Sequence, residues 1–336
     1  MSIKIAINGF GRIGRPTFRR IIDNHKNLEV LAINDLIDVK TLVHLLKYDS
    51  VYGEYKKNID YGDDFIVVDN KKIKVFSEKD PVNLPWKKMG IDIVLECSGV
   101  FTDVDSSKKH IIAGAKKVII SAPSKSEEVP AFVLSVNENR YNPERDNIIS
   151  MGSCTTNCLA VMAKIINDHF KIVKGFMTTC HSYTNDQRIL DLSHKDLRRA
   201  RAAALNIIPT TTGAASTIGK IMPELNGKLD GIAIRVPTPT VSILDLIVEI
   251  EKKTSAEEVN NVFRKIAKRL KGIVRVEDNP LVSSDFIGDS HSAIIDSSLT
   301  TVIDNLVKVV GWYDNEWAYS CRLAEFAEFV GNKIKK

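Results

Sequence analysis

The chain contains 336 residues, 44% of them hydrophobic, and its 47 basic and 42 acidic side chains give a formal net charge of +5. A chain of this length and composition supports two domains with cores of their own and excludes a disordered or fibrous protein. The Lys and Arg residues are scattered rather than grouped, which favours a solvated surface over a nucleic-acid groove.

No stretch approaches about eighteen uninterrupted apolar residues, and the first residues lack the basic and apolar pattern of a secretory signal. The five cysteines form an odd set without a CxxC pair. We therefore expect a cytoplasmic protein that needs no membrane. Cys154 and Cys158 are spaced like two ligands on a helix, but no motif supplies the remaining ligands that zinc requires, so we expect no metal site.

The first part of the chain alternates strands and helices. A buried strand at 4–7, a helix at 16–24 and a strand at 28–33 form a βαβ unit. Separated apolar runs predict further strands at 65–68, 91–95, 117–120 and 132–136. This alternation predicts an α/β fold with a doubly wound, mostly parallel sheet of the Rossmann type.

The pattern changes after residue 150. A helix is predicted at 155–170, followed by longer strands at 175–183, 231–236 and 242–251, which indicate a second, α+β domain. The polar, Arg-rich segment 184–205 has the composition of a long ordered loop, and 315–334 has the apolar spacing of a closing helix. We place the first domain at 1–153, the second at 154–315, and expect the final helix, 316–336, to rejoin the first.

A G-x-G-x-x-G motif at 9–14 lies directly after the first strand and directly before a helix. In that context the glycines let the backbone approach a pyrophosphate at the helix N-terminus, where N–H groups and the helix dipole favour anions. The second strand ends at Asn34 and Asp35, and an acidic residue there can bind a ribose 2′-hydroxyl. The alternative is a purely structural glycine turn. The strand before the motif, the helix after it and the acidic residue at 35 favour a dinucleotide site instead.

Cys154 lies at the start of a predicted helix, where the helix dipole stabilises a thiolate. The alternative is a small buried cysteine beside Ser and Thr helix caps. His181 ends a predicted strand and can act as a base for this thiol, although an isolated histidine is more often structural.

Five long motifs in order resemble the phosphorylating glyceraldehyde-3-phosphate dehydrogenases: SCTTNC, HSYTNDQRILD, PTTTGAA, RVPTPTVS and WYDNEWAYS. The resemblance extends from INGFGRIGR to the closing helix. It implies that Cys154 attacks the aldehyde of glyceraldehyde 3-phosphate to give a hemithioacetal, while His181 accepts the proton and steadies the oxyanion. Hydride then passes to NAD, and inorganic phosphate cleaves the thioester to give 1,3-bisphosphoglycerate.

The resemblance also implies roles for other residues and a homotetramer with the Arg-rich loop near a subunit interface. The substrate phosphate is assigned to Thr184 and Arg235, and inorganic phosphate to Ser153, Thr155, Arg199, Thr212 and Gly213. The cofactor is assigned to Gly11, Arg12 and Ile13 at the pyrophosphate, Asp35 at the ribose, Ser121 in the nucleotide crevice, and Asn315 and Tyr319 at the nicotinamide.

Three positions depart from the family pattern. Met151-Gly152 precede the active-site run where Asn-Ala is usual, and Ala318 replaces a glycine beside Tyr319. Ser193 follows Leu192 where NAD-selective members carry proline, and serine there resembles members that accept NADP. Because the Asp35 carboxylate would repel a 2′-phosphate, we expect NAD to be preferred, with some use of NADP.

Two other functions stay open. Erythrose-4-phosphate dehydrogenase shares the fold, the cysteine and the histidine, but the intact HSYTND and TTTGAA runs favour the phosphorylating triose-phosphate enzyme. A redox-sensor or RNA-binding protein with this fold would use the reactive cysteine or the basic charge. The basic charge is the only feature of the sequence that supports that role. Loss of Cys154, His181 or Arg235 would have favoured it, and all three residues are present.

Overall fold

The computed structural model describes residues 2–334 and divides into two compact units. The first unit comprises the residues up to Leu134, Glu138–Gly152 and the residues from Ser320 onward. The second comprises Ser135–Asn137 and Ser153–Tyr319. None of the helices within the described residues is long and apolar enough to cross a membrane.

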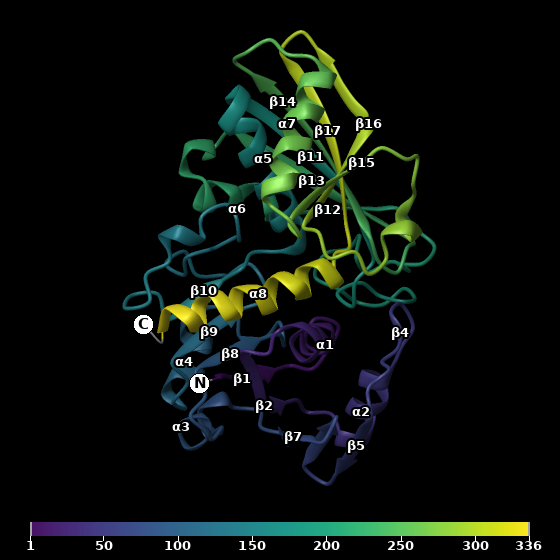
Figure 1. Ribbon diagram of the computed structural model, residues 1–336. Coiled ribbons are helices and arrows are strands. Elements are labelled where there is room, and N and C mark those ends of the chain that lie inside the picture. Colours follow the sequence, from purple (N-terminus) through teal and green to yellow (C-terminus); the bar gives the residue numbers. More distant parts are fainter. Residues whose placement is uncertain (1, 335–336) are drawn as a thin grey trace. The chain divides into compact units, whose positions relative to one another are not determined.

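The first unit is built on an eight-stranded sheet with the order β10-β9-β8-β1-β2-β7-β6-β5 (Figure 1). All pairs from β10 to β7 are parallel, whereas β5, β6 and β7 pair antiparallel. Asp69 and Asn70, both at positive φ, make the two-residue turn between β6 and β7, which is the conformation that a tight hairpin requires. The strands are β1 (Ile3–Asn8), β2 (Leu28–Asn34), β5 (Ile59–Gly62), β6 (Phe65–Val68), β7 (Lys71–Phe76), β8 (Ile93–Glu96), β9 (Lys117–Ile120) and β10 (Ile148–Ser150).

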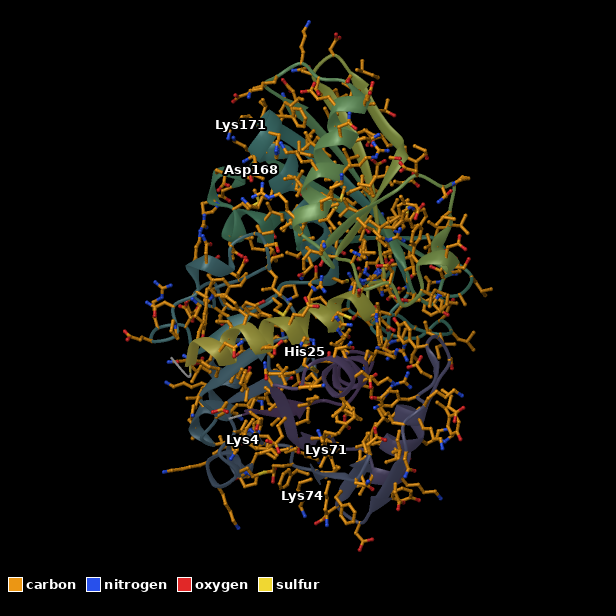
Figure 2. The ribbon with its side chains drawn as sticks, viewed as in Figure 1. Lys4, His25, Lys71, Lys74, Asp168 and Lys171 are labelled. Carbon is orange, nitrogen blue, oxygen red and sulfur yellow. The ribbon has the colours of Figure 1, made fainter. Side chains whose placement is uncertain are left out.

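Helices and a short two-stranded ladder complete this unit. They are α1 (Gly14–Asn24), α2 (Val39–Lys47), α3 (Trp86–Met89), α4 (Val104–Ile112), the greater part of α8 (Trp317–Ile334), β3 (Tyr48–Asp49) and β4 (Gly53–Glu54). Within this unit, α8 contacts α1 and the turn after it: His25 Nδ1 lies 2.8 Å from Glu328, and Arg20 lies 3.3 Å from Glu325. Figure 2 shows His25 beside α8, with Lys71 and Lys74 on β7, where the parallel and antiparallel parts of the sheet meet.

The predicted strand at 132–136 is wrong. Phe132 and Val133 are buried, but only Ala131 makes an isolated bridge, to Ser150. Ser135 has a φ of 67°, which turns the backbone out of the extended region. Phe132 instead packs on the aromatic rings of Tyr141 and Phe326, at 5.8 and 6.1 Å between centroids. The apolar run therefore reports burial rather than strand pairing.

The second unit has a seven-stranded mixed sheet with the order β12-β13-β11-β14-β17-β16-β15 (Figure 1). Helix α5 (Cys154–Phe170) and helix α7 (Ala256–Arg269) pack on each other and on this sheet, and α6 (Ala214–Ile221) packs on α5. Strands β11 and β13 run parallel, so that His181 lies opposite Arg235. The strands are β11 (Ile172–Ser182), β12 (Ile208–Thr211), β13 (Leu229–Val236), β14 (Ser242–Ile250), β15 (Val274–Glu277), β16 (Ala293–Ile303) and β17 (Leu306–Tyr313).

Candidate active site

Cys154 is the first residue of α5. Ser153 is the N-cap of this helix, and its Oγ accepts a hydrogen bond from the backbone N–H of Thr156 at 3.0 Å. The unusual Gly152 has a φ of 63°, a left-handed conformation that glycine adopts at no steric cost before the cap. The cap and the seventeen-residue helix behind it place the thiol at the positive end of the helix dipole.

His181 lies next to this thiol. Its Nε2 is 3.3 Å from Cys154 Sγ, and the side chain is almost fully buried near the end of β11. Its Nδ1 lies 2.7 Å from the carbonyl oxygen of Ser182 and 2.7 Å from Nη1 of Arg235. The parallel register of β11 and β13 causes this contact, because it sets His181 beside Arg235.

The Ser182 carbonyl decides which tautomer of His181 can act as a base. A carbonyl oxygen only accepts, so a proton on Nδ1 is donated to it, and Nε2 then presents a lone pair to the thiol. A hydrogen bond from Arg235 to Nδ1 would require the opposite tautomer. Arg235 Nη1 also donates to Ser182 O at 2.9 Å, so the guanidinium keeps a partner when Nδ1 carries the proton.

Burial and Arg235 set the charges of this pair. Burial raises the pKa of the Cys154 thiol, and the Arg235 charge and the helix N-terminus oppose that rise. Burial and the same guanidinium lower the pKa of His181 to about 3, opposed by the hydrogen bond to Ser182. His181 is therefore neutral near neutral pH and available as a base for the thiol.

A buried tyrosine that sequence reasoning missed lies behind the thiol. The hydroxyl of Tyr313 is 2.9 Å from Thr155 Oγ1 and 2.9 Å from Thr179 Oγ1. Its ring meets that of His181 edge-on, at 6.2 Å between centroids. These contacts tie the first turn of α5 to strands β11 and β17, and they hold the thiol and the imidazole at a fixed separation. No local pattern marks Tyr313, because its hydroxyl partners come from two other elements.

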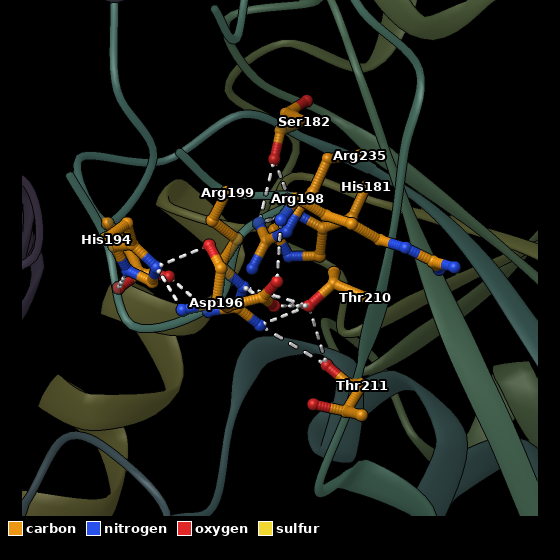
Figure 3. Close-up of polar contacts among 10 residues, drawn as sticks. His181, Ser182, His194, Asp196, Arg198, Arg199, Thr210, Thr211 and Arg235 are labelled. Carbon is orange, nitrogen blue, oxygen red and sulfur yellow. Dashed lines mark hydrogen bonds and ion pairs between the residues drawn. The ribbon is translucent and has the colours of Figure 1, made fainter. Parts of the chain in front are cut away.

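Arg199 lies in a polar cluster that links the long loop to β12 (Figure 3). Its Nε and Nη2 donate to Thr210 Oγ1 at 2.9 and 2.5 Å, and Nη1 pairs with Asp186. Asp196 lies 3.3 Å from Nε, and His194 contacts both carboxylate residues. Neither carboxylate was predicted as a partner of Arg199; Asp196 is a local neighbour three residues before it, whereas the fold brings Asp186 to it.

Of the predicted phosphate residues, Arg235 lies at the Cys154–His181 pair, whereas Thr184, Thr212 and Gly213 form a separate group. Arg235 contacts His181 directly, and the charge of Arg199 lowers the pKa of Arg235, although burial lowers it more. Nε of Arg235 is buried and has no hydrogen-bond partner among the described residues, which fits an anion that accepts from it. Thr212 Oγ1 accepts from Ala214 N at 3.2 Å, and Gly213 caps α6 without a side-chain hydrogen bond. Among the described residues, no hydrogen bond joins Thr212, Gly213 or Thr184 to the Cys154–His181 pair.

The glycine motif of the first unit forms a turn that only glycine permits. A Cβ at Gly14 would lie 2.2 Å from the carbonyl oxygen of Gly9, and Gly9 has a φ of 89°. A Cβ at Gly11 would meet nothing within 4 Å, so the outer side of the turn is open to a ligand. Ile13 caps α1 without a side-chain hydrogen bond, whereas Asp38 and Asp103 cap α2 and α4 through their carboxylates. The turn therefore fits a cofactor pyrophosphate.

Asp35 is held against this turn. Its Oδ2 accepts from the N–H of Phe10 at 2.7 Å and its Oδ1 from Ile37 at 3.1 Å. The side chain of Arg12 pairs with Asp49 at 2.5 Å, which leaves the backbone of Arg12 as the part that faces a pyrophosphate. Ser121 follows β9, and its N–H donates to the carbonyl of Glu96 at 2.9 Å. These residues can hold the adenosine half of NAD.

Asn315 and Tyr319 lie at the carboxyl end of the second unit. Oδ1 of Asn315 accepts from Ser242 Oγ at 2.9 Å, which fixes the orientation of the amide and leaves its N–H group for a ligand. Tyr319 is buried in the first turn of α8 beside Ala318, whose N–H donates to Asp314 O at 3.1 Å. The alanine is accommodated by regular helical geometry.

Two comparisons with known proteins cover nearly the whole chain. The family model "Glyceraldehyde 3-phosphate dehydrogenase, NAD binding domain" matches residues 3–104, and "Glyceraldehyde 3-phosphate dehydrogenase, C-terminal domain" matches residues 153–315. The glyceraldehyde-3-phosphate dehydrogenases of Geobacillus stearothermophilus and Streptomyces coelicolor are each 53% identical, over 99% of this chain and 99% and 100% of their own lengths.

A chloroplastic relative is similarly close. Glyceraldehyde-3-phosphate dehydrogenase A of Chlamydomonas reinhardtii is 56% identical over 98% of this chain and 89% of its own length. The match includes both the glycine turn of the first unit and the cysteine–histidine pair of the second. The chain therefore belongs to the glyceraldehyde-3-phosphate dehydrogenase family and is an NAD-dependent oxidoreductase.

Proposed function

We propose that the chain catalyses the glycolytic, phosphorylating oxidation of glyceraldehyde 3-phosphate, with Cys154 as nucleophile and His181 as general base. The observation that carries this assignment is the 3.3 Å contact between Cys154 Sγ and His181 Nε2, in a protein of this family. A thiol at a helix N-terminus beside a neutral imidazole is the arrangement that nucleophilic catalysis requires.

The proposed mechanism starts with proton transfer from Cys154 to Nε2 of His181, as the sulfur attacks the aldehyde carbon. The imidazolium then donates to the hemithioacetal oxygen and later takes the proton back as the carbonyl reforms. NAD, when bound, supplies the hydride acceptor for this step. The product is a thioester on Cys154, which keeps the acyl group activated for attack by phosphate.

Two cationic side chains support the anionic groups of this reaction. Arg235 lies beside His181 with a buried, unpartnered Nε, and we assign it with Thr184 to the substrate phosphate. We assign inorganic phosphate to Arg199 together with Ser153, Thr155, Thr212 and Gly213. The guanidinium of Arg199 is already oriented by Thr210, and the uncapped start of α6 adds backbone N–H groups.

The two compact units correspond in this proposal to an NAD-binding and a catalytic domain. Gly11, Arg12, Ile13, Asp35 and Ser121 bind the adenosine and pyrophosphate parts of NAD, and Asn315 and Tyr319 bind the nicotinamide. NAD is preferred because the Asp35 carboxylate repels a 2′-phosphate, and Ser193 permits some use of NADP.

We further propose a cytoplasmic homotetramer. All five cysteines are free thiols, as expected in a reducing compartment. Large apolar side chains of the long loop are 65–85% exposed, including Ile189, Leu190 and Leu192, and Phe176 is 69% exposed on the sheet of the second unit. Patches of this kind on a protein surface mark contacts with other chains.

The assignment is tested by following reduced-nicotinamide absorbance with glyceraldehyde 3-phosphate and NAD, with and without inorganic phosphate. We expect sustained turnover that requires phosphate and is absent in Cys154→Ser. His181→Asn should keep the fold and lower kcat by about a hundredfold to ten-thousandfold, the range for loss of a general base. Turnover equally fast without phosphate would exclude the phosphorylating reaction, and erythrose 4-phosphate would be tested next.

A further inference from the structure

Three adjacent parallel strands of the first unit end in a buried polar residue. These are Glu96 of β8, Asn8 of β1 and Asn34 of β2, and none is more than 5% exposed. Asn8 is the register partner of both Asn34 and Glu96, so the three side chains form a row across the sheet. We call this row the end-of-strand ladder.

Hydrogen bonds run along this ladder in one direction. Nδ2 of Asn34 donates to Oδ1 of Asn8 at 2.7 Å, and Nδ2 of Asn8 donates to Oε2 of Glu96 at 2.5 Å. Oε1 of Glu96 accepts from the N–H of Ser98 at 2.7 Å and also from Ser98 Oγ. Glu96 is the last acceptor of the ladder, because both of its carboxylate oxygens receive these hydrogen bonds.

A second pair of buried side chains, Trp86 and His110, also holds the Glu96 carboxylate. Trp86 Nε1 donates to His110 Nδ1 at 3.1 Å, and an indole N–H can only donate. His110 therefore carries its proton on Nε2, which lies 3.0 Å from Oε2 of Glu96 and donates to it. Glu96 thus receives donors from four side-chain or backbone groups, and His110 cannot change its tautomer without losing Trp86.

The ladder ends where the cofactor-binding segments begin. Gly9 follows Asn8 and opens the glycine turn, and Asp35 follows Asn34. A Cβ at Gly9 would lie 2.5 Å from the backbone nitrogen of Ser98, so the glycine turn rests on the backbone that Glu96 holds. A shift of the Ser98 backbone therefore shifts the turn.

We propose that Glu96 is a positioning residue for the adenosine diphosphate part of the cofactor. It holds the glycine turn, through Asn8 and the Ser98 backbone, in the spacing that the pyrophosphate needs. The inference rests on the placement of NAD at the glycine turn under the proposed function, and it does not depend on the chemistry at Cys154.

The main test is Glu96→Gln, with ADP-ribose binding measured by calorimetric titration. ADP-ribose contains the pyrophosphate and both riboses but no nicotinamide, so it reports on the cofactor site of the first unit. Whichever way the new amide turns, its N–H₂ group faces an N–H donor: Asn8 and His110 at one position, or the Ser98 backbone at the other. We expect the Kd for ADP-ribose to rise about tenfold, as for loss of a hydrogen bond to a charged group.

Two readouts separate positioning from a general loss of structure. At saturating NAD, kcat and the KM for glyceraldehyde 3-phosphate should stay within about twofold of wild type, because only cofactor binding is affected. Glu128→Gln is the matched control: it makes the same substitution at an exposed side chain of the same unit, and it should leave the Kd unchanged.

A second charge in the ladder gives a further test. Asn8→Asp sets two carboxylates against each other and should weaken ADP-ribose binding at least as much as Glu96→Gln. A carboxylate at position 8 still accepts from Asn34, so the loss reports on the contact with Glu96.

Ser98→Ala provides a milder change should Glu96→Gln fail to fold. It removes the hydroxyl that Glu96 accepts from but keeps the Ser98 N–H contact, and we expect the Kd to rise about threefold. Wild-type affinity in Glu96→Gln, Asn8→Asp and Ser98→Ala would overturn the inference. Failure of the wild-type protein to bind ADP-ribose would instead overturn the proposed placement of NAD.

Discussion

The charge of Arg235 acts on both members of the Cys154–His181 pair. It lowers the pKa of the thiol against the larger effect of burial, and it adds to burial in lowering the pKa of the imidazole. Removing the charge should therefore raise both pKa values. The thiolate fraction at a given pH then falls, because a higher thiol pKa means less ionisation.

Arg235→Gln tests this effect through alkylation of Cys154 by iodoacetamide as a function of pH. We expect the midpoint of the pH–rate profile to move to higher pH, and the rate near neutral pH to fall about tenfold, as for loss of a charge within a few ångströms. Arg201→Gln, which removes a guanidinium from an exposed pair with Asp191, is the control and should leave the profile in place. An unchanged midpoint in Arg235→Gln would contradict the electrostatic role.

Asp35 holds the turn through the N–H of Phe10, and in the proposed function its charge also opposes NADP. Asp35→Asn keeps an oxygen acceptor for the Phe10 N–H but removes the charge, whereas Asp35→Ala removes both. We expect Asp35→Asn to lower the KM for NADP about tenfold with a small change for NAD. Asp35→Ala should weaken both cofactors. Steady-state kinetics with each cofactor test this expectation. Equal changes in the KM values of Asp35→Asn and Asp35→Ala would contradict it.

At the scale of elements, the N-terminus of α5 combines a stabilising cap with a proposed phosphate ligand in Ser153. Ser153→Ala should cost about 1 kcal/mol of stability, lower the Tm by about 2–4 °C, and raise the KM for phosphate. The matched variant is Ser255→Ala, which removes the equivalent cap of α7, where Oγ accepts from Glu258 N at 3.1 Å. Ser255→Ala should lower the Tm alone, and a raised KM for phosphate in both variants would argue against a specific role for Ser153.

Several elements of the fold could be read from local sequence. The strand at 4–7, the helix at 16–24 and the helix at 155–170 appear with shifts of a few residues, because apolar spacing and capping residues act locally. The antiparallel direction of β5, β6 and β7 was not predicted, although these strands follow one another in the chain and the turn between β6 and β7 is local. The segment at 132–136 was assigned to a strand because burial and strand pairing produce the same apolar run.

At the scale of the whole molecule, the exposed apolar side chains of the loop and the sheet lead to a test of assembly. Sedimentation should give four times the 37.5 kDa mass of the chain. Leu190→Glu or Phe176→Glu should shift the protein towards smaller species, because a charge at a buried contact is strongly unfavourable. Ile112→Glu changes an equally apolar residue that is 63% exposed on α4, and it should leave the mass unchanged. A monomeric wild-type protein would exclude the tetramer.

The sequence alone determined the chemistry that is available: the glycine turn with its acidic residue, the thiol at a helix start, and the family to which these motifs belong. Such features are set by residue type and local spacing, and they need no knowledge of the fold. Only the tertiary structure decided which groups act on one another. The register of β11 and β13 places Arg235 against His181, the loop brings Asp186 to Arg199, and three strand ends bring Glu96 to Asn8. These contacts depend on strand order and long-range packing, which no local pattern records.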